Sequence, residues 1–157
     1  MPDDLYRTDI VTWSRQQAER LRRHVAGERV NDLDWAHVIE EIEDLGLSEI
    51  AAVRSLLIQA MVHALKLARW PESPARMHWS SEAATFLEQA QDRYRPSMAQ
   101  QIEVERCFAR ARRAVLAIEG DTPAHPIPDR TDLTLAQLMD EAADLRTLIE
   151  TLGRGPA

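Results

Sequence analysis

Apolar residues recur every three to four positions along most of the 157-residue chain, a spacing typical of amphipathic α-helices. The longest stripe runs over residues 34–69, where the apolar positions stay on one broad face at about 100° per residue. It includes Trp35, Val38, Ile39, Ile42, Leu45, Ile50, Val53, Leu57, Met61, Ala64 and Leu67. Because the phase does not slip at Gly46, the pattern favours one long helix, which ends before Pro71.

The alternative at Gly46 is a break, with Ser48 as the N-cap of a second helix. Glu49 distinguishes the two interpretations. In a continuous helix, Glu49 points near the centre of the apolar face and needs a polar partner. After a break, it is a favourable acid in a first helical turn. We favour the continuous helix.

Three shorter segments also have helical spacing. The first begins at Thr8 as N-cap and ends at Gly27, where glycine suits the left-handed backbone after a helix. The second covers about residues 77–92. The third starts at Pro96, which fits a first helical turn, and runs to a stop at Gly120.

The end of the chain has the clearest helix start. Thr134 followed by Gln137 forms a capping box, and the apolar stripe behind it continues to Gly153. Residues 121–130 carry three prolines and predict an extended linker. The pattern as a whole predicts an all-α, single-domain helical bundle over residues 1–157, with about five helices and one long central helix.

Composition and charge argue against nucleic-acid binding and membrane association. Hydrophobic residues make up 45% of the chain, and the formal net charge is −7. No segment is basic overall, so we expect no nucleic-acid partner. No apolar run approaches the roughly 20 residues that span a bilayer, and the acidic N-terminus lacks the order of a signal peptide. We therefore expect a cytoplasmic protein without membrane association.

An acidic run is the first candidate for chemistry. Glu40, Glu41, Glu43 and Asp44 follow His37, and spacings of three and four place several of these side chains on one helix face. An imidazole with carboxylates in this spacing could hold a divalent metal. However, the face lies opposite the apolar stripe, and the chain lacks the Glu-x-x-His pairs of di-iron bundles. We favour a solvated face and predict no cofactor.

A second candidate lies near the end of the long helix. His63 and Lys66 could support proton transfer, and Trp70 with Trp79 could line a ligand cleft or a partner site around the proline loop. The simpler interpretation is a histidine at the core edge, a lysine stem over apolar surface and tryptophans that fill core space. Cys107, the one cysteine, cannot form an internal disulfide and falls in an apolar stripe as a core residue. No catalytic residue is assigned.

Several of these motifs resemble the bacterial family catalogued as domain of unknown function 29. The resemblance rests on Leu5-Tyr6, Asp9, Trp13, Asp34-Trp35, Glu40-Glu41-Ile42-Glu43-Asp44-Leu45-Gly46, Ser48-Glu49, His63-Ala64-Leu65-Lys66, Trp70, Trp79 and Thr134-Leu135-Ala136-Gln137-Leu138. It covers nearly the whole chain. It implies an all-helical fold and no known activity, and it suggests that Glu40, Glu41 and Glu43 pair with arginines or face a partner.

We therefore expect a non-enzymatic interaction or regulatory protein that self-associates as a homodimer or binds another protein. The long amphipathic helix and the terminal stripe offer more apolar surface than five short helices would cover. The alternatives are a small metal-dependent enzyme or metal-binding helical protein, and an antitoxin-like partner encoded beside another protein. Whether the chain is an enzyme stays open, although no phosphate loop, nucleophile elbow or zinc motif is present.

Overall fold

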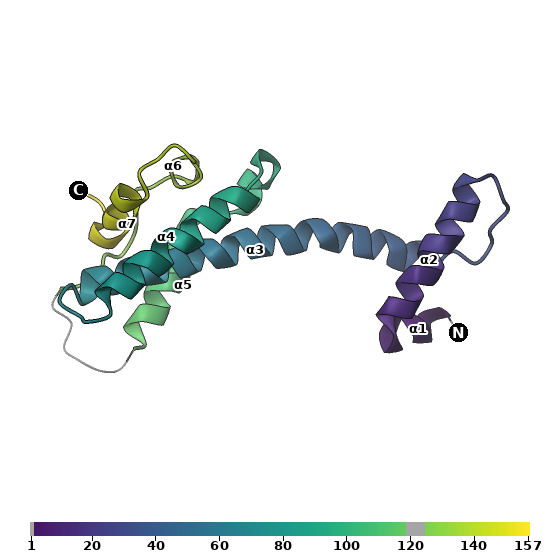
Figure 1. Ribbon diagram of the computed structural model, residues 1–157, viewed down its shortest axis with the longest axis horizontal. Helices are drawn as coiled ribbons and strands as arrows, with labels where there is room; N and C mark the ends of the chain where they lie inside the picture. Colours follow the sequence, from purple (N-terminus) through teal and green to yellow (C-terminus); the bar gives the residue numbers. More distant parts are fainter. Residues whose placement is uncertain (1, 119–124) are drawn as a thin grey trace. The chain divides into compact units, whose positions relative to one another are not determined.

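The computed structural model describes residues 2–118 and 125–157, and within them all regular structure is helical (Figure 1). The all-α prediction is confirmed. The chain divides into two compact units, Met1–Leu47 and Ser48–Ala157, and each is described by itself. That the whole chain behaves as one domain stays a prediction.

The first unit contains α1 (Pro2–Thr8), α2 (Ile10–Val25) and the first part of α3. Thr8 was expected as the N-cap of the second of these helices, but Asp9 has that role. Its carboxylate accepts hydrogen bonds from the Thr12 amide at 3.0 Å and the Thr12 hydroxyl at 2.6 Å. The predicted stop is confirmed, since Gly27 has a φ of +86° directly after the C-cap.

Helix α3 (Trp35–Arg69) is assigned as one 35-residue helix that includes Gly46, as the unbroken apolar phase predicts. The boundary between the two units falls inside it. Glu49 has the polar partner that a continuous helix requires, because a nitrogen of the Arg93 guanidinium lies 3.5 Å from its carboxylate. Both side chains are about half exposed, so the pair contributes little to stability.

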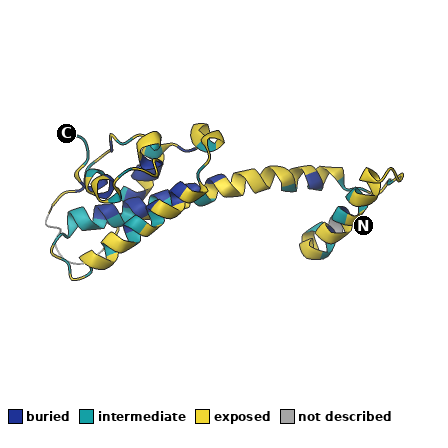
Figure 2. Ribbon diagram, turned by 45° about the horizontal axis from the view of Figure 1, so that its top comes forward, coloured by how far each residue is buried: buried dark blue, intermediate teal, exposed yellow. Residues whose placement is uncertain are grey.

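The second unit packs the rest of α3 against α4 (Arg76–Arg93), α5 (Val104–Leu116) and α7 (Leu145–Arg154). Figure 2 shows the buried residues of α3 concentrated along this part of the helix. The largest fully buried side chains are Val53, Leu57, Met61, Leu65, Leu87, Phe108, Val115, Leu138 and Leu152. These side chains form the core that holds the unit together.

The helix expected from Pro96 is two elements. A 3₁₀ helix, η1 (Pro96–Gln101), comes first, with its proline near the N-terminus as predicted. Ile102 and Glu103 then adopt extended backbone before α5 begins. Ile102 is buried in the core, and this burial favours the interruption over a continuous helix. The predicted stop at Gly120 and part of the linker over 121–130 lie outside the described residues.

The last predicted helix is also two elements. The capping box is present at the start of α6 (Leu135–Leu138), but this helix ends after one turn. Asp144 caps α7 by accepting hydrogen bonds from the amides of Arg146 and Thr147, both at 3.3 Å. The stop expected at Gly153 lies two residues later, at Gly155, whose φ is +72°.

The expectation that no apolar segment approaches the length of a membrane span is wrong for α3. Helix α3 is, by length and composition alone, apolar enough to cross a membrane, with an 18-residue window of mean hydropathy 1.5. A mostly buried core helix of a soluble protein meets the same criterion; α3 supplies much of the core of the second unit, although only 28% of this window is buried. The feature therefore carries little weight in assigning a location.

Candidate functional site

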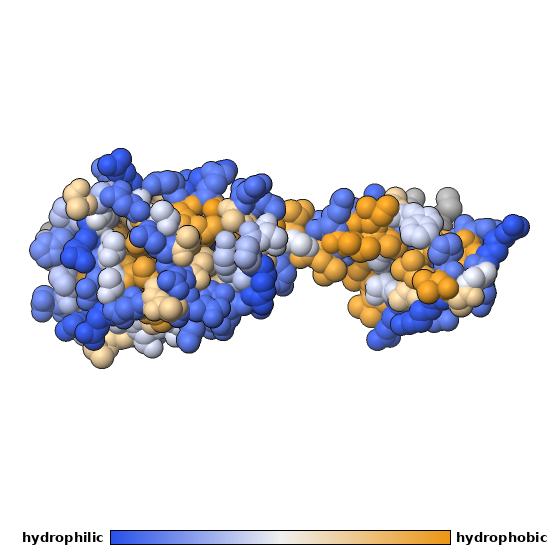
Figure 3. All heavy atoms as spheres, turned by 90° about the horizontal axis from the view of Figure 1, so that it is seen from above, coloured by the Kyte–Doolittle hydropathy of each residue, from blue (hydrophilic) through white to orange (hydrophobic). Residues whose placement is uncertain are grey.

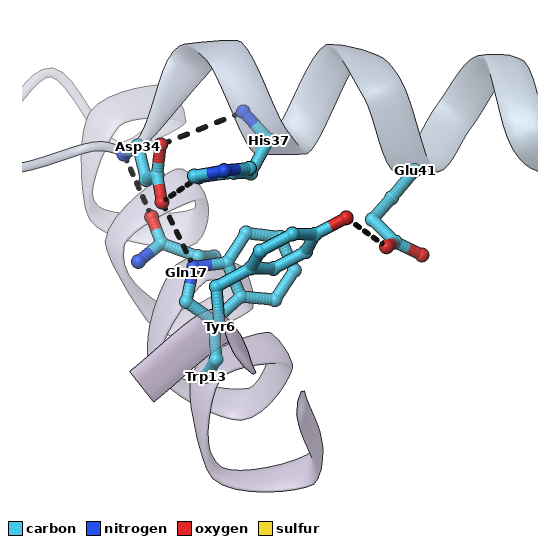
Figure 4. Close-up of polar contacts among 6 residues, drawn as sticks. All are labelled: Tyr6, Trp13, Gln17, Asp34, His37 and Glu41. Carbon is cyan, nitrogen blue, oxygen red and sulfur yellow. Dashed lines mark hydrogen bonds and ion pairs between the residues drawn. The ribbon is translucent and has the colours of Figure 1, made fainter. Parts of the chain in front are cut away.

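A polar and aromatic cluster of the first unit, here called the α2–α3 latch, surrounds Asp34 (Figure 4). The Asp34 carboxylate accepts hydrogen bonds from the indole Nε1 of Trp13 at 3.0 Å and from the backbone amide of His37 at 3.5 Å. Nδ1 of His37 lies 2.7 Å from the same carboxylate. The Asp34 amide donates to the buried Gln17 side chain at 2.9 Å. Asp34 thus caps the start of α3 and ties it to α2.

The latch also includes Tyr6, which extends it to α1. Its ring stacks on His37 with centroids 3.9 Å apart, and the edge of Trp13 packs against it at 4.9 Å. Its hydroxyl donates a hydrogen bond to Glu41 at 2.7 Å. That hydrogen bond is the main cause that raises the pKa of Tyr6 to about 12, because ionisation would break it and place two negative charges together.

The electrostatics of Asp34 favour its ionised form. Burial opposes the charge, but the hydrogen bonds from His37 and Trp13 outweigh it and leave the pKa of Asp34 below its usual value. The side chain of Asp34 is one-tenth exposed and that of His37 about one-fifth. Every contact of this carboxylate joins α3 to α2 or to its own first turn. The geometry therefore makes the latch a device that holds the helices of this unit in place.

The latch separates the residues that sequence spacing had combined into a metal site. His37 turns Nδ1 to Asp34, and Glu41 binds Tyr6. Glu40, Glu43 and Asp44 are exposed. Across residues 2–118 and 125–157, no three His, Cys, Asp or Glu side chains gather in a way that could hold a metal ion. The metal-binding alternative therefore has no support from geometry in this part of the chain.

The pairing suggested for the acidic run is only partly present. Glu41 pairs with a tyrosine rather than an arginine. Among the ion pairs of the described chain, no arginine partner is found for Glu40, Glu43 or Asp44. These three carboxylates are therefore unneutralised charges on the surface of the unit, open to a cationic partner.

An exposed apolar stripe runs along the same part of α3. Its residues are 49–70% exposed and comprise Trp35, Ile39, Ile42 and Leu45; Leu47, also exposed, lies on another side of the helix. Figure 3 shows apolar atoms gathered on the surface of the first unit, in the right-hand part of the view. Scattered single apolar residues are normal on a protein surface, but a contiguous patch of this kind is typical of an interaction site.

The second unit brings together the other predicted residues. His63 stacks on Phe86 with centroids 5.7 Å apart, and Trp70 lies 6.2 Å from Trp79. The ammonium of Lys66 lies 5.7 Å from the Trp79 ring. Burial and then the nearby Lys66 charge lower the pKa of His63. His63 Nδ1 is buried and has no hydrogen-bond partner. The cluster fits the simpler interpretation, in which these side chains close one edge of the core.

The site and fold define an all-helical protein whose first unit displays an apolar and charged helix face. Comparison with protein families matches residues 5–143 to the family described as "Domain of unknown function DUF29". The chain belongs to this family, as its motifs indicate.

A solved structure is also similar. It is the crystal structure, at 1.45 Å resolution, of an alpha-helical protein of unknown function from Rhodospirillum rubrum ATCC 11170. The two chains are 31% identical, with a TM-score of 0.63, and the match covers 96% of this chain and 98% of the other. The comparison with curated proteins gave no match. These relatives support the fold and assign no activity.

Proposed function

We propose that the chain is a non-enzymatic interaction protein that forms a homodimer through its first unit. The observation that carries the proposal is the exposed apolar stripe of α3, in which Ile42 is 62% and Leu45 70% exposed. Burying one such side chain in an interface contributes roughly 1.5–3 kcal/mol when burial is complete. Several neighbouring side chains of this kind supply the apolar centre that a stable interface needs.

Charge favours a second copy as the occupant. Helix α2 carries four arginines and one glutamate, whereas residues 30–53 contain neither lysine nor arginine. The two sets are Arg15, Arg20, Arg22 and Arg23 on α2, and Glu40, Glu41, Glu43 and Asp44 on α3. Within one chain, Arg20, Arg22 and Arg23 already pair with acids of the same unit, whereas Arg15 has no ion pair among the described residues. In a two-fold pair, α2 of each copy can face the acidic run of the other, and Arg15 is the cation that can reach it without breaking an existing pair.

Sedimentation velocity between about 1 and 100 μM tests the proposal. We expect the wild-type chain to sediment as a dimer of the 17.9 kDa protomer. Ile42→Glu places a charge in the stripe and should yield monomer at every concentration, because a carboxylate without a partner is costly to bury. Ala51→Glu is the matched control: it adds the same charge to an exposed position on the opposite side of α3.

Circular dichroism of both variants separates dissociation from unfolding, since Ile42 is exposed and its replacement should leave the helical signal unchanged. A wild-type chain that stays monomeric at 100 μM would overturn the proposal. So would an Ile42→Glu variant that dimerises as well as the Ala51→Glu control. A monomeric wild type that captures a different protein through the same stripe would point to the binding of another partner.

The proposal includes a cytoplasmic location. A buried, unpaired Cys107 suits a reducing compartment, where disulfides are rare. Fractionation of cells that produce the protein tests this point, with recovery in the soluble fraction as the expected result. Recovery in the membrane fraction would instead implicate α3, whose composition permits a membrane span.

A further inference from the structure

We propose that the second unit contains a binding site for a phosphate group, formed by three arginines from two helices. Arg54 of α3 and Arg106 and Arg110 of α5 line a pocket of about 120 Å³, together with Gln101. The wall is completed by Glu103, and the apolar Ile58 and the buried Cys107 contribute the remaining lining. This site is separate from the stripe of the first unit and does not rest on the proposed dimer.

The electrostatics of Cys107 reflect the same arrangement. Burial raises the pKa of the Cys107 thiol; the charges of Arg54, Arg110 and Arg106 oppose that effect, and the charge of Glu103 adds to it. All three guanidinium groups therefore act on one sulfur atom. The three arginines are exposed, so solvent screens the repulsion between them and leaves them accessible to an anion.

The neighbouring acids neutralise this charge only in part. Glu103 is the one carboxylate that lines the pocket, and it pairs with Arg106 at 3.2 Å, where both side chains are largely exposed. Arg106 and Arg110 are four residues apart on α5, a spacing at which like charges destabilise a helix. Among the described residues, neither Arg54 nor Arg110 has an ion pair. The pocket therefore has excess positive charge in a protein whose net charge is −7.

The size and chemistry of the pocket select the ligand class. The small volume of about 120 Å³ and the mainly polar lining suit one tetrahedral oxyanion better than a bulky apolar group. Planar guanidinium forks bind the oxygens of phosphate through paired hydrogen bonds. A phosphate dianion offers more oxygens and more charge than a carboxylate, and three forks can share it. The Gln101 amide adds a further donor at the same pocket.

Isothermal titration calorimetry with inorganic phosphate tests the site, at pH 8 and at constant ionic strength set with NaCl. We expect saturable binding at one site per chain. Arg110→Gln and Arg54→Gln should each weaken the affinity about tenfold or more, because each removes a charge-assisted contact. Arg113→Gln is the matched control, since this exposed arginine lies on the same helix and does not line the pocket. Its affinity should equal that of the wild type.

A second titration with glycerol phosphate distinguishes the source of the group. Equal or tighter binding would identify a phosphate carried by a larger molecule, whereas binding of inorganic phosphate alone would identify the free ion; either result supports the site. Absence of saturation up to about 20 mM of both ligands would overturn the proposal. An Arg110→Gln variant that binds as tightly as the Arg113→Gln control would overturn it as well. Sedimentation of the same samples measures whether the chain still dimerises. Failure of the phosphate site can therefore be distinguished from failure of the proposed dimer.

Discussion

Replacing Asp34 with alanine tests the role of the latch most directly. The substitution removes the acceptor for the Trp13 indole, the partner of His37 Nδ1 and the cap at the first turn of α3. Trp13 is only 4% exposed, so its Nε1 loses a partner in a place that water reaches poorly. Loss of a helix cap costs about 1 kcal/mol, and an unpaired buried donor costs about 1–3 kcal/mol. The expected loss is about 2–4 kcal/mol.

Hydrogen exchange followed by mass spectrometry can assign this loss to the first unit. A change of 2–4 kcal/mol corresponds to a roughly 30- to 1,000-fold faster exchange of protected amides. We expect the increase across α2 and the start of α3, with little change in α4, α5 and α7. Asp32→Ala is the control, because the Asp32 side chain is 62% exposed and its ion pair with Arg20, at 2.8 Å, is only partly shielded from solvent. Its loss should change exchange by about fivefold or less.

Equal exchange in the Asp34→Ala and Asp32→Ala variants would refute the reasoning, since it would mean that the latch adds nothing beyond a surface ion pair. Faster exchange throughout the second unit would refute it in a different way. That result would show that the hydrogen bonds of Asp34 stabilise the whole chain rather than the first unit.

Three further predictions follow from the geometry. The pKa of Asp34 is lower in the folded state than the usual value near 4. Its contribution to the stability of the folded state should therefore be complete above about pH 4 and be lost as pH falls through the folded-state pKa. Hydrogen exchange or circular dichroism against pH can measure this loss. Gly153→Val should lower the free energy of unfolding by about 1–3 kcal/mol in urea titrations, because a Cβ there lies 3.0 Å from the Cβ of Ala68 and 3.2 Å from the carbonyl oxygen of Ala64. Cys107, 3% exposed and with its pKa raised chiefly by burial, should react with iodoacetamide at pH 8 on the order of a hundredfold more slowly than in the urea-unfolded chain.

Sequence predicts well those helices whose buried face follows a regular apolar spacing. The stripe of α3 gives its length, because its apolar residues keep one phase through Gly46. Helix α1 is missed because its seven residues, Pro2–Thr8, are too few to set a period. The break between α6 and α7 is missed for the opposite reason: apolar spacing continues across it. A distant contact helps to hold the turn, in which Gln91 donates to the carbonyl oxygens of Leu138 at 2.8 Å and Asp140 at 3.3 Å.

At the latch and the phosphate pocket, sequence patterns likewise fail to reveal contacts between distant residues. The pairing of Asp34 with His37 is local and follows a readable pattern, a capping acid three residues before a histidine, whereas the spacing of His37 to Glu40 and Glu41 indicates a different set of partners. The hydrogen bond from Tyr6 to Glu41 joins residues 35 positions apart, so no local pattern could reveal it. The arginines of the phosphate pocket come from α3 and α5, and only the packing of those helices brings them together. Sequence indicates which residue types are present, whereas tertiary packing decides which of them meet.

The stripe of α3 connects these observations to the proposed function. Over residues 48–69, its apolar side chains are covered within the second unit, and Val53, Leu57 and Ala60 are fully buried. Over residues 35–47, the same periodicity continues, but Ile42 and Leu45 stay mostly exposed. Surface positions with no apolar contact to make tolerate polar residues at little cost, so folding of the first unit does not by itself call for large apolar side chains there. The proposed partner would supply a reason for them, and the nearby unneutralised carboxylates favour a partner with a free cation, such as Arg15 on α2 of a second copy.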